Sequence, residues 1–402
     1  MLDAQSHFEQ IRDTLPGDGQ ARAATLAAAE AVGLPTRRVE SWHYTDLARL
    51  LKSGEATGVR TVDFAGVKAL EAHFENGLLH GEPQAEGLSV APFSNTIAHT
   101  EAPSPDTVMA SYNHALAQNG LTAEVSGTLA QPLVIRTSGT QPVHLAHKIS
   151  LAAGAKAVLV DDHMATGYAN VVFDIHLGEG AELTLLRSQQ AGHQVGLSRV
   201  TLEQDARYKS VAMISGGILA RHEAHVTLKA AQAHAELHSA VLGHGLSKAA
   251  THADFTYVIE HQAADTSSNT SAYNVLDGNA RGVFQGKIIV RPDAQRVDAQ
   301  MQTRAMMLSE GAEMDAKPEL EIYADDVVCA HGSAIGELDR DALFFLRSRG
   351  LDEATARQLL VAAFLEQVTT HIDDEGLSEI MRQLVDTKIN TLLGNLSGEV
   401  SS

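Results

Sequence analysis

Apolar and polar residues follow different patterns in three successive stretches of the chain. Over the first 55 or so residues, Phe8, Ile11 and Leu15 recur at helical spacing. An alanine-rich run then stops at Gly33 and Pro35, which is how a helix with a glycine end finishes. We therefore predict helices at the start of the chain.

The last stretch, from Asp339 onward, is helical by the same criteria. A first run begins at Asp339 and stops at Gly350. The next run carries Leu359, Leu360 and Phe364 on one stripe, as expected for a helix that packs one face against the rest of the protein.

The middle of the chain has a different pattern. Between about 126 and 336, short β-rich runs such as "PLVIRTSG" and "KAVLVDDH" alternate with small turns. No helix-length amphipathic segment separates them, which disfavours a sheet of alternating strands and helices. We predict a mainly β protein with three parts: an N-terminal helical or mixed domain (1–125), a β core (126–336) and a C-terminal helical domain (337–402).

A weak repeat runs through the β core. The units "ISLAAGA", "IHLGEGA", "VTLEQDA" and "VTLKAAQ" begin at Ile149, Ile175, Val200 and Val226, at spacings of 26, 25 and 26 residues. Further units, at 288 and 306, repeat the shape out of phase. A period in the mid-twenties with two or more strands fits a solenoid of stacked β coils. A meander or sandwich with hairpins of similar length is the alternative.

Composition and charge exclude several classes of protein. The chain has 402 residues, is 44% hydrophobic, and contains no apolar run near the 18 residues that a membrane helix needs. Its formal net charge is −20, with 30 basic against 50 acidic residues, so we expect no nucleic-acid partner. The N-terminus lacks the pattern of a secretion signal, and a single cysteine permits no internal disulfide. We therefore expect a cytoplasmic protein.

The stretch "GNARGVFQGKI" (278–288) invites comparison with a phosphate-binding loop, but its spacing is wrong. Only three residues separate Gly282 from Gly286, and Lys287 is followed by Ile288 rather than Ser or Thr. A strand–turn–strand with glycines at the bends fits better. If ATP is involved in the function, we expect another chain to bind it.

Histidines are the first candidates for metal chemistry. Seven of the twenty fall between 222 and 261. In "HAELH", a strand would place His234, Glu236 and His238 on one face, a geometry suited to a divalent metal, which His144 and His147 could join only through the fold. Alternate polar residues also mark the solvated face of a strand, so both interpretations stay open. No H-E-x-x-H metalloprotease signature occurs.

The only cysteine lies in "DDVVCAHGSAIGEL" (325–338), and His331 follows it by two positions. On a strand, Val327, Cys329 and His331 point to the same side, with about 7 Å between the Cα atoms of Cys329 and His331. Thiolate and imidazole both bind iron and iron–sulfur clusters, but a stable cluster usually needs four protein ligands. Either the pair is structural, or a second protein completes the ligand set.

Three segments resemble a known family. "KPELEIYADDVVCAHGSAIGELDRDALFFLRSRGLDEATARQLLVAAF" (317–364) closely resembles the C-terminal signature of the SufB/SufD family of iron–sulfur cluster assembly proteins. "TSSNTSAYNVLDGNARGVFQGKIIVRPDAQRVDAQMQ" (266–302) is similar to its central motif, and "PTRRVESWHYTDL" (35–47) to an N-terminal element typical of the SufD branch. Leu346 stands where the SufB pattern has a cysteine, which also favours the SufD branch.

The resemblance implies a fold and a set of partners. The fold is a right-handed parallel β-helix core flanked by N- and C-terminal helical domains. The family members SufB and SufD form a complex with two copies of the ATPase SufC, in which the β-helix cores pair and the C-terminal helices dock SufC. The function implied is that of a non-catalytic scaffold, with no ATP site of its own.

The resemblance also points to individual residues. The family's C-x-H-G histidine, linked to the nascent cluster at the SufB interface, corresponds to His331, while Cys329 matches by position and its role is less defined. The transient cluster would be shared with SufB. Two other hypotheses are a metal-dependent β-fold enzyme that uses the 222–261 histidines and a self-pairing β-helix scaffold. The sequence leaves open whether flavin or iron is carried, and whether homodimers form without SufB.

Overall fold

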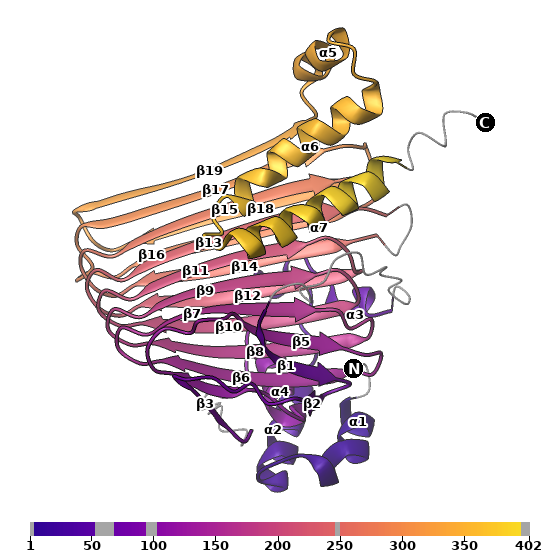
Figure 1. Cartoon of the computed structure of the whole chain (residues 1–402). Helices are drawn as coiled ribbons and strands as arrows, with labels where there is room; N and C mark the ends of the chain where they lie inside the picture. Colours follow the sequence, from indigo (N-terminus) through magenta and orange to yellow (C-terminus); the bar gives the residue numbers. More distant parts are fainter. Residues whose placement is uncertain (1–3, 53–67, 94–102, 246–249, 395–402) are drawn as a thin grey trace.

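The computed structural model describes residues 4–52, 68–93, 103–245 and 250–394, with side chains described as far as 390. The predicted N- and C-terminal domains (1–125 and 337–402) each include residues outside these ranges. Within them, the chain forms two long β-sheets with helices on their outer surfaces (Figure 1). The protein is mainly β, as the pattern of short β-rich runs predicts.

Successive strands alternate between the two sheets. The ten-stranded sheet consists, in spatial order, of β19 (Val327–Glu337), β17 (Val297–Met307), β15 (Ser267–Leu276), β13 (His234–Gly243), β11 (Arg207–Ile214), β9 (Glu182–Gln189), β7 (Lys156–His163), β5 (Leu133–Ser138), β1 (Leu70–Glu75) and β2 (Leu78–His80). The nine-stranded sheet consists of β18 (Glu313–Ile322), β16 (Arg281–Val290), β14 (His252–His261), β12 (Leu219–Leu228), β10 (His193–Leu202), β8 (Tyr168–Leu177), β6 (Val143–Leu151), β4 (Thr122–Val125) and β3 (Leu88–Ala91).

From β4 and β5 onward all neighbouring strands within a sheet are parallel, so each coil adds one strand to each sheet. This arrangement is a parallel β-helix, and the repeat read from the sequence is its register. Ile149 pairs with Ile175, Ile175 with Val200, and Val200 with Val226. The same column continues through residues 259 and 288. The unit at 306 falls out of phase because Met306 belongs to β17 of the opposite sheet. The meander and sandwich alternatives are therefore wrong.

The small or acidic turn in each unit forms a corner between the sheets. Residues at successive corners adopt positive φ, among them Gly154 (+69°), Gly180 (+62°) and Asp205 (+57°). The backbone N–H of each donates to a carbonyl at the next corner, for example from Gly180 to Gln204 at 2.8 Å. Small or polar residues suit these corners because a left-handed backbone penalises bulky side chains.

Side chains alternate between the inside of the helix and its outer surfaces, because strand residues point to opposite faces in turn. The interior is filled with apolar residues from both sheets, including Phe173, Leu185 and Phe255. Gly282, near the start of β16, and Gly286, in its middle, lie on this inner face and not at bends as predicted. A Cβ on Gly286 would come within 2.3 Å of the Met301 sulfur, so the packed interior requires glycine there.

The outer surface of the ten-stranded sheet is covered by C-terminal helices. α6 (Glu353–Thr369) and α7 (Glu375–Gly394) lie across its strands (Figure 1). Val361, Leu365 and Leu384 share one apolar cluster with residues of six strands, from Val134 on β5 to Val275 on β15. The shorter α5 (Arg340–Ser348) projects past the last strand and has no buried residue.

N-terminal elements cover the other sheet. They are α1 (Ala4–Ile11), η1 (Arg12–Thr14), α2 (Gly19–Val32), η2 (Glu40–Trp42), α3 (Leu47–Leu50) and α4 (Val108–Leu116). The segment 35–47 is anchored by Trp42, which is 1% exposed and lies against the guanidinium of Arg221, 4.0 Å from the ring centre. Arg221 is itself buried and paired with Asp254, which also accepts a hydrogen bond from Thr45.

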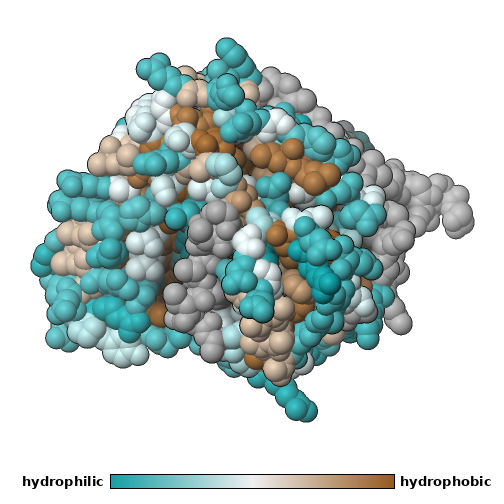
Figure 2. All heavy atoms as spheres, turned by 90° about the horizontal axis from the view of Figure 1, so that it is seen from below, coloured by the Kyte–Doolittle hydropathy of each residue, from teal (hydrophilic) through white to brown (hydrophobic). Residues whose placement is uncertain are grey.

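The two ends of the β-helix differ. At the first end, both sheets finish in short antiparallel strands: β2 pairs with β1, and β3 with β4. This end, seen from below in Figure 2, shows predominantly hydrophilic side chains with smaller hydrophobic areas between them. At the last end, the sheets finish in the full-length parallel strands β18 and β19.

No helix in the described ranges is both long and apolar enough to cross a membrane.

Candidate functional site

The final strand, β19, carries the pair of residues that the sequence singles out. Val327 and Cys329 both pack against the interior cluster, so these two side chains point to the same face, which is the inner one. His331, two residues further, has the same strand parity and is exposed. In the register Cys329 pairs with Ala299 and His331 with Met301. The sequence prediction that all three residues share a face is consistent with this geometry.

The Cys329 thiol is half-buried and is not activated. Its pKa is raised, first by burial and then by the negative charge of Asp298, against a smaller opposing effect of a hydrogen bond from the Ala299 backbone. A thiol whose pKa is raised stays protonated at neutral pH, so it is a poor nucleophile. It would act as a ligand only when a metal displaces its proton.

His331 is available for an intermolecular contact. Within the described ranges its imidazole forms no hydrogen bond or ion pair, and the residue is exposed although it shares a strand face with Cys329. One thiol and one imidazole on an open strand are two ligands of the four that a cluster usually takes. The described residues around the pair add no further cysteine, so this site is incomplete without a partner.

The surface around His331 combines an edge strand with exposed apolar side chains. Tyr323, Val328 and Ile335 are 58%, 64% and 51% exposed. β18 and β19 lie at the ends of their sheets, so each offers backbone donors and acceptors along one side. Together these features form a surface suited to protein association at the last end, which we call the open edge (β18 and β19).

The chain passes directly from the open edge to α5. Leu338 is buried, and the Asp339 carboxylate accepts hydrogen bonds from the backbone N–H groups of residues 341 and 342, which starts the helix. Phe344 and Phe345 are 74% and 56% exposed on α5, with the Arg349 guanidinium 4.9 Å from the centre of the Phe345 ring. A second exposed apolar surface therefore lies next to the open edge.

The histidines of the 222–261 region do not converge on one site. His222, His252 and His261 are buried on strands of the nine-stranded sheet, whereas His234 and His238 lie on β13 of the other sheet. Burial lowers the pKa of His252 and of His261 to about 4, so both are neutral at neutral pH.

The predicted cluster of His234, Glu236 and His238 does form on one face of β13. Glu236 accepts hydrogen bonds from both imidazoles, at 3.0 and 3.2 Å. The residue that joins this cluster is His371, from the connection between α6 and α7, which the sequence analysis missed. His144 and His147 lie elsewhere: His147 stacks on Phe173 in the interior.

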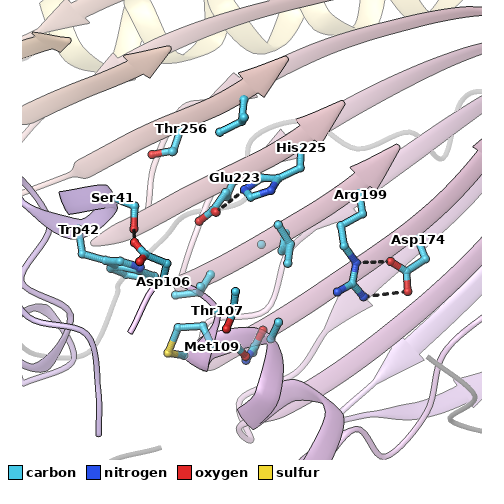
Figure 3. Close-up of a pocket in the computed structure, with 16 residues that line it drawn as sticks. Ser41, Trp42, Asp106, Thr107, Met109, Asp174, Arg199, Glu223, His225 and Thr256 are labelled. Carbon is cyan, nitrogen blue, oxygen red and sulfur yellow. Dashed lines mark hydrogen bonds and ion pairs between the residues drawn. The ribbon is translucent and has the colours of Figure 1, made fainter. Parts of the chain in front are cut away.

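The sequence analysis also missed a pocket on the outer surface of the nine-stranded sheet (Figure 3). It has a volume of about 680 Å³, and N-terminal residues Trp42 and Met109 form part of its wall. Its polar side chains pair with each other: Arg199 with Asp174, His225 with Glu223 at 2.7 Å, and Ser41 with Asp106. The lining comes from segments far apart in the sequence, so no local pattern could reveal it.

Fold and edge together define a class: a parallel β-helix with helical layers on both sheets, short antiparallel strands at one end and full-length parallel edge strands at the other. The family model "SUF system FeS cluster assembly, SufBD core domain" matches residues 134–364, which is more than half of the chain. The chain belongs to the SufBD family of iron–sulfur cluster assembly proteins.

Curated relatives agree with this assignment. The iron–sulfur cluster assembly protein SufD of Escherichia coli is 26% identical over 379 residues, which is 86% of this chain and 87% of the relative. A SufBD family protein of Mycobacterium tuberculosis is 28% identical over 85% of this chain and 86% of its own length. A SufBD family protein of Synechocystis is 33% identical over 55% of this chain and 49% of its own length.

Proposed function

We propose that this chain is a non-catalytic scaffold for iron–sulfur cluster assembly that pairs with SufB through the open edge. The observation that carries the proposal is the placement of Cys329 and His331 on β19, the edge strand of the ten-stranded sheet. In this arrangement SufB supplies the missing ligands, and the nascent cluster is the cargo of the assembled pair. The cytoplasmic setting expected from the single cysteine stays a prediction.

The open edge supports pairing on physical grounds. A full-length edge strand with unpaired backbone groups favours addition of another strand, and proteins usually protect such edges. Exposed side chains such as Val328 and Ile335 would add apolar burial to the backbone hydrogen bonds. A second copy of the chain could use the same edge, so homodimers are expected to compete when SufB is absent.

His331 is the proposed ligand, with Cys329 as a less certain second. The exposed imidazole lacks a partner within the described ranges, whereas the thiol is half-buried and its pKa is raised. Replacement of His331 by alanine should reduce cluster formation by the complete SufB–SufC complex at least about tenfold, since one cluster ligand is lost. Iron and sulfide analysis together with visible absorbance measures the yield.

The matched control is His80→Ala on β2, the outermost strand of the same sheet at its other end, where the side chain is also exposed. Undiminished assembly by His331→Ala, with normal complex formation, would rule out a ligand role for this residue.

The proposed docking surface for the ATPase SufC is α5. It has no buried residue and presents Phe344 and Phe345 to solvent. In this scheme, ATP-driven closure of SufC shifts the population between two arrangements of the SufB pair and opens the edge to iron and sulfur.

A point variant tests docking better than deletion of the C-terminal domain. Deletion of residues 339–402 would also remove α6 and α7 and expose the apolar surface that they cover. Phe344→Ala combined with Phe345→Ala leaves that cluster intact and should abolish co-purification with SufC. Normal SufC binding by this double variant would exclude α5 as the docking surface.

The alternative function, a metal-dependent enzyme that uses the 222–261 histidines, has less support. Those histidines are divided between the two sheets, and family membership favours the scaffold. The two histidines on β13, His234 and His238, instead form a cluster with Glu236 and His371.

A further inference from the structure

The outer surface of the ten-stranded sheet brings together residues from two distant parts of the chain. Glu236 and His238 lie on β13, and His371 follows α6. Their potential ligand atoms all lie within 4.8 Å of one another. The imidazoles of His238 and His371 lie parallel, with ring centres 3.5 Å apart and planes 8° from each other. His234 is connected to the same group through its hydrogen bond to Glu236.

A second layer of contacts orients two of the imidazoles. The Nδ1 atoms of His234 and His238 are each 2.7 Å from a serine hydroxyl, Ser267 and Ser271 respectively, on the neighbouring strand β15. The β-sheet register places each histidine directly beside its serine. With Nδ1 held in this way, both Nε2 atoms point to the Glu236 carboxylate. Histidines that bind metals usually have their second ring nitrogen fixed by a hydrogen-bond partner of this kind.

The surroundings favour a neutral imidazole at His371 and a charged carboxylate at Glu236. The pKa of His371 is lowered to about 4, mainly by burial and then by the neighbouring His238, so its ring is neutral and can coordinate at neutral pH. The pKa of Glu236 is held below its usual range by hydrogen bonds from the two histidines. The nearby Lys209 ammonium is bonded to Asp373 at 2.9 Å, which offsets part of its positive charge.

The group is accessible from solvent. A small pocket of about 190 Å³ lies beside it, lined by His234, Glu236, Lys209 and Asp373 among others. His238 is buried, whereas the side chains of His234 and Glu236 are each 25% exposed. An ion can therefore reach the carboxylate without unfolding the sheet.

We propose that Glu236, His238 and His371 bind a first-row divalent transition-metal ion, with His234 as a fourth ligand. Three imidazoles and a carboxylate suit ions such as Zn²⁺, with metal–ligand distances of about 2.0–2.2 Å. In tetrahedral geometry the ligand atoms lie about 3.3 Å apart, so Glu236, His238 and His371 must draw together by up to about 1.5 Å, and His234, outside the 4.8 Å group, must move toward them. The His371 ring must also tilt out of its parallel stack, because the in-plane lone pairs of parallel rings do not converge.

Such a site has a structural consequence. His371 belongs to the connection between α6 and α7, whereas the other three ligands belong to β13. A bound ion would fasten the C-terminal helical layer to the β-helix, and binding to the folded state alone would raise its stability. This proposal is independent of the open edge and of the partners that bind there.

Titration of the chelator-treated full-length protein with Zn²⁺ tests the site. We expect one ion per chain and a higher unfolding midpoint. Co²⁺ is expected to give the visible absorption bands of a four-coordinate site with nitrogen and oxygen ligands. His371→Ala, in a half-exposed connection that should tolerate the change, is expected to weaken Zn²⁺ binding about 100-fold and to remove the Co²⁺ bands. The same Zn²⁺ titration of His234→Ala should show a smaller loss.

The chain contains a matched control. Glu223 and His225 form the same pair two residues apart on β12, hydrogen-bonded at 2.7 Å, but no third ligand joins them within the described ranges. His225→Ala should bind Zn²⁺ as tightly as the unmodified chain. The proposal is overturned if the unmodified chain binds no stoichiometric Zn²⁺, or if His371→Ala and His225→Ala behave alike.

Discussion

The two ends of the β-helix terminate their sheets in opposite ways. At the first end, the chain turns back on itself at Asn76 and Gly77, and the short strand β2 covers β1 in antiparallel fashion. At the last end, β19 runs parallel to β17 for eleven residues and then leads directly into α5. A solenoid needs a terminating element at each end to stay soluble, unless a partner provides one. The difference is the basis for the proposal that the last end, and not the first, pairs with a partner.

The largest expected effect is the loss of folding stability in acid. The interior of the β-helix buries neutral histidines, in contrast to the exposed His331 at the open edge. Burial lowers the pKa of His147 to about 3 and that of His163 to about 4. The unfolded chain binds these protons near pH 6.5, so stability is present above that pH and is lost as pH falls through the folded pKa values. Asp161, whose pKa burial raises to about 6, acts in the opposite direction but is a single group.

Acid unfolding monitored by circular dichroism should therefore begin below pH 6.5. At pH 5, each histidine with a folded pKa of about 4 accounts for about 2 kcal/mol, so His163, His252 and His261 together account for about 6 kcal/mol. His163 has no hydrogen-bond partner at either ring nitrogen within the described ranges. His163→Leu should raise the unfolding midpoint more at pH 5 than at pH 8. An equal rise at both pH values would show that this histidine does not carry the acid sensitivity.

The next effect concerns pairing at the open edge. Val328→Lys combined with Ile335→Lys should weaken association with SufB at least about 100-fold, or about 2.7 kcal/mol, because two ammonium groups would have to be desolvated at the interface. Isothermal titration calorimetry measures this change. Leu78→Lys is the matched control, since Leu78 is 66% exposed on the outermost strand at the other end of the same sheet. Equal binding by the two lysine variants would remove the distinction between the ends.

The smallest effect concerns the turn at the closed end. The Asn76 side-chain oxygen accepts hydrogen bonds from the backbone N–H groups of Thr140 and Gln141, both at 3.0 Å. Asn76→Ala leaves those exposed donors without this acceptor and should lower the free energy of unfolding by about 0.5–1.5 kcal/mol in denaturant titrations. Asn76→Asp keeps the acceptor and should lose less. Pairing with SufB should stay unchanged in both variants, and a loss of pairing would mean that the two ends are coupled.

Local patterns in the sequence predicted much of the fold because a solenoid repeats its contacts. Each coil places Ile149, Ile175, Val200 and Val226 in one column, so the repeat itself gives the register. The shared face of Val327 and Cys329 followed from strand alternation alone. That β19 is the last strand of its sheet does not follow from the pattern, because no local sequence pattern marks a strand as the last one.

What the sequence could not supply were contacts between units that lie far apart in the chain. His371 contacts His238 only because α6 and α7 pack across the ten-stranded sheet. No local sequence pattern predicts the angle at which these helices lie on the strands. The contact between the Trp42 ring and the Arg221 guanidinium likewise joins residues far apart in the chain, so no local pattern predicts it. Gly282 and Gly286 were assigned to bends because glycine usually marks a bend. Here Met314 occupies the space where a side chain at Gly282 would be, and Met301 occupies that space at Gly286.

The helical layer over the ten-stranded sheet also affects how the protein unfolds. Stacked coils that contact only their neighbours can open one at a time from a free end. Here α6 and α7 share one apolar cluster with strands from β5 to β15, so those coils are tied together as a single cooperative block. The outer strands β18 and β19 carry no buried residue of that cluster. Amide protons of the last coil should therefore exchange by local opening, well before the block, which leaves the pairing strand free to rearrange while the body stays folded.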